Sequence, residues 1–585
     1  MISIGLVALV GSCTDGDDDG ADATTAIPED CVEVPAAVSS EKVTLLTDLA
    51  ADFNATDPEV DGTCVRMSIY RVASGRGASL LAEGWPEGGD EAPPPVLWSP
   101  ASSAWGAVLN HRLAQAGMPE MAGDYERIML TPLVLAMPRP MAEALGWPEA
   151  DIGWSDILAL AESEGGWADF GHPEWGPFRF GKTNPNFSTS GLSATVAIYY
   201  AATGKVAGLS LDDVGSASVG SFVSGVEAAT VHYGDTTLTF LDNMLREDLN
   251  GRPLTYASAV AVEEVSVIAY NRGDPADQGL PDPTPPNVPL VAVYPKEGTL
   301  FSDNPAFVLD APWVTETQAE AARRFVEFVV DDPENQAKAL DFGFRPGNPA
   351  VPIGEPISAA NGLNPTQPKT ELQVPEPEVL AALIDSWETY RKPARVLVVF
   401  DVSGSMGDLG GGGYTKLDLA KQAVLATLDQ FKPDDEVGLW IFSTRLDGDL
   451  DYVELVPIGT LSKVRAEIER LVPRLIADGG TGLYDTTRAA VQEIRDTFDT
   501  TRINAVMLLS DGMCDDYDDG CELEPLLRFL SSSERDVVRV FPVAYGADAD
   551  TEALRAIAEA SQAKLYTAAD PLTIERVFEQ VISNF

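Results

Sequence analysis

The sequence has few of the residues on which many enzymes and nucleic-acid-binding proteins depend. It contains only three histidines, His111, His172 and His232, and neither an HExxH nor a GxSxG motif is present. Basic residues are also scarce, with 39 Lys and Arg against 91 Asp and Glu and a formal charge of -52. Such a charge repels phosphate backbones and anionic headgroups, and is typical of a well-solvated surface or of one that attracts cations. We therefore expect no nucleic-acid partner and no catalytic activity.

Long apolar runs are missing beyond the first residues. No later stretch approaches the roughly 18 to 20 apolar residues that a membrane-spanning helix needs. Residues 1–12 are mostly apolar, end in small residues, and are followed by Cys13 and an acidic stretch. This pattern resembles a bacterial lipoprotein signal. It departs from such a signal in one respect, because no Lys or Arg precedes the apolar run, and we therefore expect the true signal to begin further upstream. The resemblance implies cleavage before Cys13, lipid on its thiol, and a protein anchored at the outer face of the cytoplasmic membrane by that lipid alone.

Five cysteines occur, and none belongs to a CxxC motif, so a structural zinc site is not indicated. If Cys13 carries lipid, an even set of four remains, which suits an exported protein with two disulfides. The pairings we favour are local in sequence, Cys31 with Cys64 and Cys514 with Cys521, because each pair then lies within one proposed domain.

The length of 585 residues predicts more than one domain. Prolines concentrate between residues 349 and 377, where no periodic apolar pattern survives, and an amphipathic stretch follows from Glu378 to Tyr390. We divide the chain into a signal peptide (1–12), an acidic tether (13–36), an N-terminal domain (37–350), a Pro-rich linker with a connecting helix (351–392) and a C-terminal domain (393–585).

In the C-terminal domain, apolar strands alternate with helical patterns, which predicts an α/β fold with a doubly wound, largely parallel sheet. The expected strands are residues 395–400, 437–442, 503–509 and 537–543. The expected helices are residues 417–431, 461–475, 483–498, 524–532 and 551–560. Ligands of such sheets bind beyond the carboxyl ends of the strands.

Oxygen-bearing side chains gather at those strand ends. Asp401, Ser403 and Ser405 follow the first strand at alternate positions, Thr481 lies in a glycine-rich turn, and Asp511 follows a later strand. Hydroxyls and carboxylates are the ligands of hard cations, so the pattern predicts a site for Mg²⁺, or for Ca²⁺ or Mn²⁺. Two carboxylates among five ligands leave a coordination position for water or an incoming group.

The three motifs, in this order, resemble the metal-ion-dependent adhesion site of von Willebrand factor type A domains, over about 190 residues. The resemblance implies a Rossmann-like fold in which Ser403, Ser405 and Thr481 coordinate the ion and Asp401 and Asp511 bind it directly or through water. It also implies a protein partner that supplies a carboxylate to the ion; an acidic residue of the N-terminal region folded back onto the site is the alternative source. The alternative is a hydrogen-bonded turn that holds no metal.

Two segments beside these motifs are less informative. The glycine-rich run at residues 408–414 is expected to be a mobile surface loop beside the site, with phosphate contact as a remote alternative. The aspartates between Cys514 and Cys521 do not match an EF-hand spacing, so a solvated loop closed by a disulfide is favoured over a second ion site.

The N-terminal domain has a mixed α/β pattern, and its blocks at residues 98–105, 131–137, 181–191 and 294–299 resemble a two-lobed, periplasmic-type extracellular solute-binding protein. Hydroxyls and free backbone N–H groups at loop-to-helix junctions suit a small anion or polar solute. The candidate solute-binding residues are Ser99, Ser102, Ser103, Thr183, Ser188, Ser190 and Gly191. The alternative is that they cap helices without any ligand. Trp98, Trp105, Trp154, Trp167 and Trp175 are expected in the core or as a stacking surface.

Taken together, these features predict a lipid-anchored, non-enzymatic binding protein that pairs a solute-binding domain with a cation-dependent interaction domain. The alternative is a substrate-binding receptor of an ABC-type transporter with an accessory docking domain.

Overall fold

The computed structural model describes residue 28 and residues 31–86, 93–234, 236–276, 280, 282–515, 521–532 and 537–585. Cys13, its lipidation and most of the acidic tether lie outside this range. Among the described helices, none has the length and apolar character needed to cross a bilayer. Disulfides join Cys31 to Cys64 and Cys514 to Cys521, as predicted.

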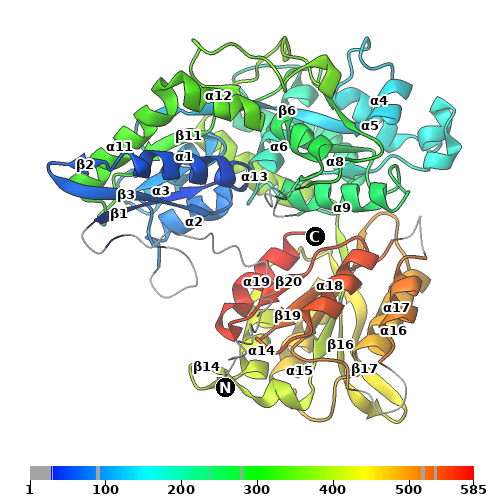
Figure 1. The fold of residues 1–585 in the computed structure, drawn as a ribbon. Coiled ribbons are helices and arrows are strands. Elements are labelled where there is room, and N and C mark those ends of the chain that lie inside the picture. The colour runs from blue at the N-terminus through cyan, green and yellow to red at the C-terminus, as the bar shows by residue number, and fades with distance from the viewer. Residues whose placement is uncertain are drawn as a thin grey trace, which may run out of the picture.

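The first lobe of the N-terminal region is a six-stranded sheet between two layers of helices (Figure 1). Its strand order is β2 (Glu59–Val60), β3 (Thr63–Arg71), β1 (Val32–Val38), β4 (Leu97–Ser99), β11 (Pro305–Val308) and β5 (Tyr125–Arg127). One face packs against α1 (Val43–Ala55), α11 (Glu316–Asp331) and α12 (Pro333–Phe342), and the other against α2 (Ser74–Ala82) and α3 (Ala104–Gln115). Burial alternates along β3 because Val65, Met67 and Ile69 face the core under α1, while the residues between them face the other, less covered side of the sheet.

The second lobe is a sheet centred on β6 (Met129–Pro138), which pairs with four other strands. These are β8 (Ala259–Glu263), β9 (Leu290–Val293), β10 (Phe301–Ser302) and β12 (Arg345–Pro346), and β7 (Phe180–Gly181) extends the sheet beyond β8. Its helices are α4 (Arg139–Ala144), α5 (Trp154–Glu162), α6 (Thr189–Thr203), α7 (Leu211–Val214), α8 (Ala217–Ala228), α9 (Thr237–Leu249) and α10 (Glu264–Arg272).

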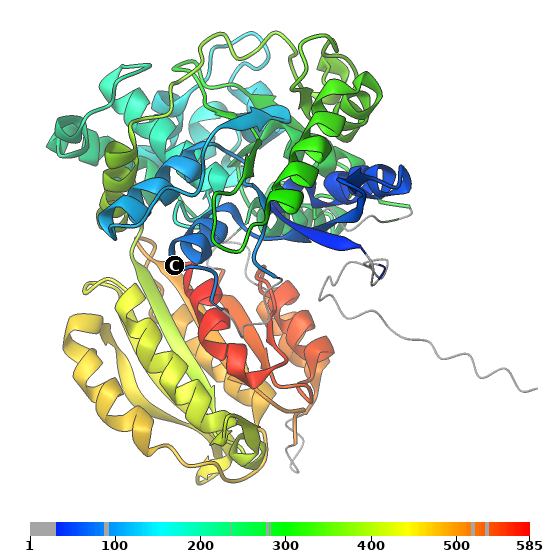
Figure 2. The ribbon, with the colours of Figure 1, turned by 90° about the vertical axis from the view of Figure 1, so that its left-hand side faces the viewer.

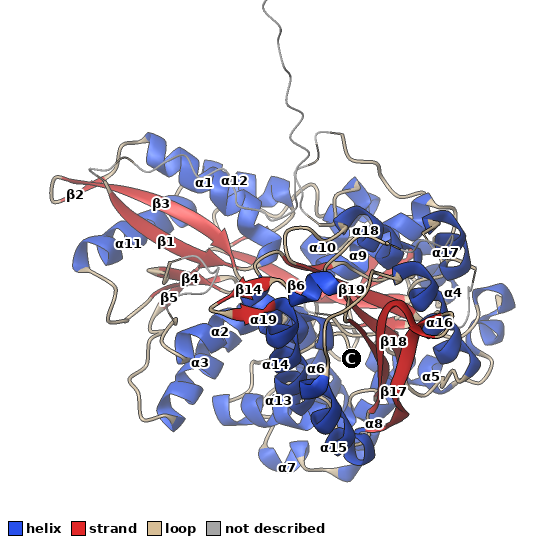
Figure 3. Cartoon of the chain, turned by 90° about the horizontal axis from the view of Figure 1, so that it is seen from below, coloured by secondary structure: helices blue, strands red, loops and turns tan. Residues whose placement is uncertain are grey.

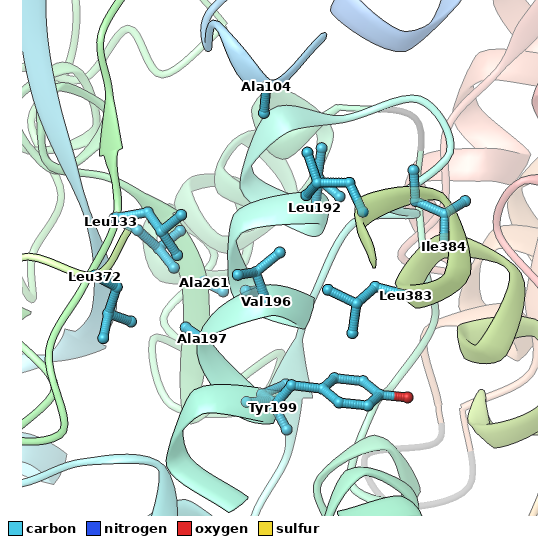
Figure 4. Packing of buried hydrophobic residues seen from close by; sticks show 14 of the residues in the cluster. Ala104, Leu133, Leu192, Val196, Ala197, Tyr199, Ala261, Leu372, Leu383 and Ile384 are labelled. Atoms are coloured by element: carbon cyan, nitrogen blue, oxygen red, sulfur yellow. The ribbon is translucent and has the colours of Figure 1, made fainter. Parts of the chain in front are cut away.

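A single apolar core runs through both lobes. It includes Trp98 and Trp105 of the first lobe and Val196 and Tyr199 of the second, all almost fully buried. Figure 4 shows Ala104 of α3 above Leu192 of α6 in this cluster. Trp154 and Trp167 are buried in it as well, and Trp175 packs against it. The predicted core role of the tryptophans is confirmed.

Helix α13 (Pro377–Tyr390) is part of the same core. Its apolar residues Val379, Leu380, Leu383 and Ile384 are buried with α6 and α8 of the second lobe and with α3 of the first (Figure 4). The chain before it also packs on the N-terminal region, because Leu372 is buried in the core and Glu371 bridges Thr299. The segment expected to link the two domains therefore packs against the N-terminal region, both at Leu372 and along α13.

The C-terminal domain is a six-stranded sheet with helices on both faces. Its strand order is β17 (Leu450–Thr460), β16 (Glu436–Asp447), β13 (Ala394–Asp401), β18 (Ile503–Ser510), β19 (Arg539–Tyr545) and β20 (Tyr566–Ala568). All neighbours are parallel except the edge strand β17, which pairs with β16 antiparallel. One face carries α14 (Lys416–Thr427), α15 (Leu461–Leu471) and α19 (Ile574–Ile582), and the other α16 (Leu483–Asp496), α17 (Leu523–Leu530) and α18 (Thr551–Ala560), as Figure 3 shows from below.

The two domains meet through buried polar contacts around Tyr233 of the second lobe. Within that lobe, Lys182 Nζ donates to Glu227 Oε1 over 2.6 Å, both of these side chains are fully buried, and Tyr233 OH donates to Glu227 Oε2 over 2.8 Å. Tyr233 OH in turn accepts from the backbone N–H of Lys392, and its own N–H donates to Asn584 O. These bonds connect the second lobe to both ends of the C-terminal domain.

Candidate functional site

The predicted cation ligands lie at the carboxyl ends of the parallel strands, at the end of the C-terminal domain that faces away from the N-terminal region. Strand β13 begins at the domain junction and runs to Asp401 at the far end, close to the β14 hairpin (Figures 1 and 2). This placement sets the site apart from the acidic residues of the N-terminal region. Within the described ranges, no hydrogen bond or ion pair links these ligands to an acidic residue of the N-terminal region, and that source of a carboxylate stays a prediction.

Asp401 is held from two sides. The backbone N–H of Ser403 donates to its Oδ1 over 2.8 Å, and the hydroxyl of Ser510 donates to its Oδ2 over 2.8 Å. The residue is fully buried, and burial together with the nearby Asp511 carboxylate raises its pKa to about 6. A buried carboxylate that carries its charge next to a second one is stabilised by a bound cation.

A chain of hydroxyls joins Asp401's turn to Asp511. Ser403 Oγ and Ser405 Oγ lie 3.0 Å apart, and Ser405 Oγ donates to Asp511 Oδ1 over 2.7 Å. Asp511 Oδ2 accepts from the ammonium of Lys416 over 2.9 Å. The lysine was not among the residues predicted from the sequence, and its position as the first residue of α14 beside the glycine run was the only signal.

Thr481 approaches from the second loop. A methyl group in place of a hydrogen on Gly512 would lie 3.3 Å from Thr481 Oγ1 and 3.7 Å from Ser405 Oγ, so both hydroxyls flank one small space. Backbone bonds fix the three loops to one another: Gly404 N–H donates to Gly479 O, and Asp515 N–H donates to Thr481 O. The structure therefore brings all five predicted ligands into one cluster.

The donor set fits a hard divalent cation. It offers three hydroxyls and two carboxylates, and no thiol or imidazole. Within the described ranges, no group of three or more His, Cys, Asp or Glu side chains is placed to hold a metal, and the present cluster, with only two carboxylates, is not such a group either. Lys416 already neutralises one of the two carboxylates, so an incoming ion meets a site with less negative charge than the motif alone suggests.

The glycine-rich run, expected to be a surface loop, forms a short hairpin. Strands β14 (Leu409–Gly411) and β15 (Tyr414–Thr415) pair antiparallel, and Gly411, Gly412 and Gly413 all have positive φ. Glycine adopts this backbone region without steric cost, which is why the run can turn so tightly. Thr415 then caps α14 through a reciprocal pair of bonds with Asp418 and so positions Lys416.

The candidate solute-binding residues lie where the two lobes meet, at the starts of α3 and α6. Ser102 Oγ accepts from Ala104 N–H, Thr183 Oγ1 donates to Ser188 Oγ, and Ser190 Oγ donates to Glu263 Oε2 over 2.6 Å. Ser99 is fully buried, and its hydroxyl has no hydrogen-bond partner in the structure. Ser103 N–H donates to Asp303 Oδ1, and Gly191 packs against the backbone of residues 183 and 184. Their role in binding a solute stays a prediction.

The lobes contact each other directly at this place. Trp105 Nε1 of α3 donates to Thr189 Oγ1 of α6 over 2.9 Å, and Gly75 N–H donates to Phe187 O over 3.0 Å. Two buried charges also face the junction: burial lowers the pKa of Lys42 to about 8, and burial with the nearby Glu41 raises that of Glu263 to about 7. The structure thus shows the lobes closed on each other. A groove of about 770 Å³ lies elsewhere, between β5 and α11, and touches none of the candidate residues.

Comparisons with known proteins match two separate parts of the chain. The family model of bacterial extracellular solute-binding proteins matches residues 34–345, more than half of the chain, and that of the von Willebrand factor type A domain matches residues 396–513. No curated protein matches the chain.

Several solved structures resemble parts of it. A von Willebrand factor type A protein from Catenulispora acidiphila is 23% identical with a TM-score of 0.28, and the match covers 33% of this chain but only 42% of that one. A periplasmic binding protein from Actinobacillus pleuropneumoniae, with exogenous fructose-6-phosphate bound, is 16% identical (62% of this chain, 99% of that one, TM-score 0.40). Maltose-bound MalE3 of T. maritima is 13% identical (62% and 94%, TM-score 0.41). On the family match, this chain belongs to the bacterial extracellular solute-binding proteins, and its C-terminal part is a von Willebrand factor type A domain.

Proposed function

We propose that the protein is a lipid-anchored surface protein that binds a protein partner through a divalent cation held by Asp401, Ser403, Ser405, Thr481 and Asp511. The convergence of three loops on one cluster of five oxygen-bearing side chains carries this proposal. The ion supplies a positive charge with an open coordination position, to which a carboxylate of the partner binds.

The position of the cluster supports a role in contact with other molecules. It lies at the end of the C-terminal domain that faces away from the described lobes of the N-terminal region (Figure 1). The buried residues hold the ligand atoms before any ion arrives, because Asp401 and Ser403 are bonded to each other and to neighbouring strands. Such preorganisation lowers the entropic cost of binding.

The test is calorimetry of Mg²⁺, Ca²⁺ and Mn²⁺ binding to the full chain and to its Asp401→Ala variant. We expect binding of at least one ion to the natural chain and its loss in the variant. Asp408→Ala, which removes an exposed carboxylate from the neighbouring turn, is the matched control and should keep the affinity. Equal binding by the natural chain and Asp401→Ala would refute the site.

A second function, binding of a small polar or anionic solute, is favoured by the family match of the N-terminal region. It would make the protein a receptor that serves a transporter, with the C-terminal domain as a docking element. Because the lobes are closed, a solute must first separate Trp105 from Thr189 or bind in an open form. A thermal-shift screen of anions, sugars and amino acids tests this: a ligand that stabilises the natural chain, but not a Ser190→Ala variant, would support it. No shift with any of these solutes would argue that the region is a scaffold.

A further inference from the structure

The most exposed large apolar side chains of the described chain gather at one end of the C-terminal domain. Six have exposed fractions between 48% and 79%, whereas all other large apolar side chains within the described ranges are exposed by 47% or less. We call these six the apolar rim: Leu409, Tyr414, Leu450, Ile476, Met513 and Leu572. Exposed apolar side chains that cluster commonly mark interaction sites.

The rim surrounds the cation ligands. Leu409 and Tyr414 belong to the β14–β15 hairpin, and Leu572 lies against Gly411 of that hairpin. Met513 follows the ligand Asp511 by two residues. These four side chains therefore flank the site on the side of α14 and on that of β18.

The other two complete the rim. Ile476 lies two residues before Asp478, whose N–H donates to Val402 O in the turn of Asp401. Leu450 follows the tip of the β16–β17 hairpin, which extends beyond the pairing of Phe442 with Asp401. All six thus come from loops at the carboxyl ends of the strands.

The charges of the same loops are mostly negative. Among the described residues of these loops, the exposed aspartates are Asp408, Asp447, Asp449, Asp478, Asp515, Asp548 and Asp570, and the exposed basic residues beside them are Arg445 and Arg474. A surface of this kind attracts basic groups at long range and repels acidic ones. A bound dication makes the electrostatic potential positive only at the centre of this surface.

We propose that the apolar rim and its aspartates form a docking surface for a basic protein segment that carries one carboxylate between apolar residues. The carboxylate binds the ion, the apolar side chains cover the rim, and Lys or Arg side chains pair with the outer aspartates. This inference rests on the proposed cation site and adds the chemistry of the partner. A second copy of this chain is disfavoured because each carries a formal charge of -52, and a membrane because aspartates repel anionic headgroups.

The experiment selects a random peptide library, displayed on phage, against the full chain in Mg²⁺ and removes clones that stay bound in EDTA. We expect the selected peptides to share one Asp or Glu, flanked by apolar residues and then by Lys or Arg. A synthetic peptide of that sequence should bind the natural chain in fluorescence anisotropy and lose binding when its acid is replaced by the amide. Peptides without the apolar flanks, or no enrichment at all, would overturn the proposal.

The combined variant Leu409→Ser, Ile476→Ser and Met513→Ser tests the rim itself. Its peptide affinity should fall by at least about tenfold, which corresponds to about 1.4 kcal/mol of binding free energy lost over the three truncated side chains together. Its Mg²⁺ affinity, measured by calorimetry, should be unchanged. The combined Val206→Ser and Leu211→Ser variant, which removes exposed apolar residues of the N-terminal region, should bind as the natural chain does.

These measurements separate two failures. If the natural chain binds no cation, the proposed function fails and the docking surface with it. If the cation binds but the rim variant retains full peptide affinity, only the docking surface fails. Vesicles of phosphatidylcholine, with or without phosphatidylglycerol, complete the test: binding of vesicles that the rim variant loses would assign the surface to lipid and refute a protein partner.

Discussion

Replacing Lys416 by Met should strengthen cation binding. The Lys416 ammonium lies 2.9 Å from Asp511 Oδ2, and the lysine and aspartate side chains are 8% and 0% exposed. Coulomb's law gives a repulsion of roughly 3 to 7 kcal/mol between this ammonium and a dication about 5 Å away, for effective dielectric constants of 20 to 40. Relaxation of the site and screening by solvent reduce this value, so we expect a gain in Mg²⁺ affinity of about 10- to 1,000-fold.

The same substitution should destabilise the protein without metal, because Asp511 then keeps a buried charge with no cation beside it. Removal of one partner of a buried pair typically costs about 3 to 5 kcal/mol, and Mg²⁺ should restore most of it. Calorimetry gives the affinity and thermal unfolding gives the stability. Lys421→Met is the matched control, since that lysine pairs with Asp418 one turn further along the same helix, at 3.6 Å. Equal affinities of the natural chain and Lys416→Met, within a factor of about two, would refute this reasoning.

Three further predictions concern the structure that carries the site. Leu383→Ala, at a fully buried position of α13, should lower the free energy of unfolding of the N-terminal region by about 2 to 5 kcal/mol, measured as a shift in urea midpoint. Replacing Cys31 and Cys64 by Ser opens a link of sequence separation 33 and should cost up to about 4 kcal/mol, seen as a lower melting temperature without reductant. His232 has its pKa held well below 6.5 by burial and by Arg539, so the folded state disfavours the proton that the unfolded state takes up. Its contribution to stability is therefore present above pH 6.5 and is lost below it, by about 1.4 kcal/mol per pH unit. The melting temperature of His232→Gln should fall less between pH 7 and pH 5.5 than that of the natural chain. An equal fall in both proteins would contradict the assignment.

The strands of the C-terminal domain could be predicted from the sequence because their apolar runs are continuous. Residues 395–400 and 503–509 became β13 and β18, which are buried on both faces. The candidate cation ligands could be predicted because they lie at the carboxyl ends of these strands or in the nearby glycine-rich turn. Helix α19 was missed although its apolar residues, among them Val577 and Phe578, have helical spacing.

Contacts between distant segments could not be predicted. Lys416 and Asp511 are 95 residues apart, and nothing local indicates that an ammonium should lie in the cation site. The apolar stripe of α13 predicted a helix, but such a stripe can pack on any apolar surface and does not specify two lobes as its partner. The closed arrangement of the lobes is likewise a property of tertiary packing. In the sequence, the serines at the starts of α3 and α6 suit a cap as well as a ligand, but the N-cap residues Ser103 and Ser188 make no side-chain cap hydrogen bond in the structure.

Strand β13 gives the protein a defined path for mechanical force. A partner that pulls on Asp401 pulls along the axis of β13, which is hydrogen-bonded on both sides, to β16 and β18, over nearly its whole length. Force in this direction loads the ladders in shear, so many bonds share it before any one breaks. At its other end the strand continues from α13 through Arg391, which is bonded to Asp435 of the C-terminal domain and to Glu388 of that helix. Tension applied by a partner bound at Asp401 would therefore pass along β13 into α13, and the contacts of α13 with the two lobes would carry the load first.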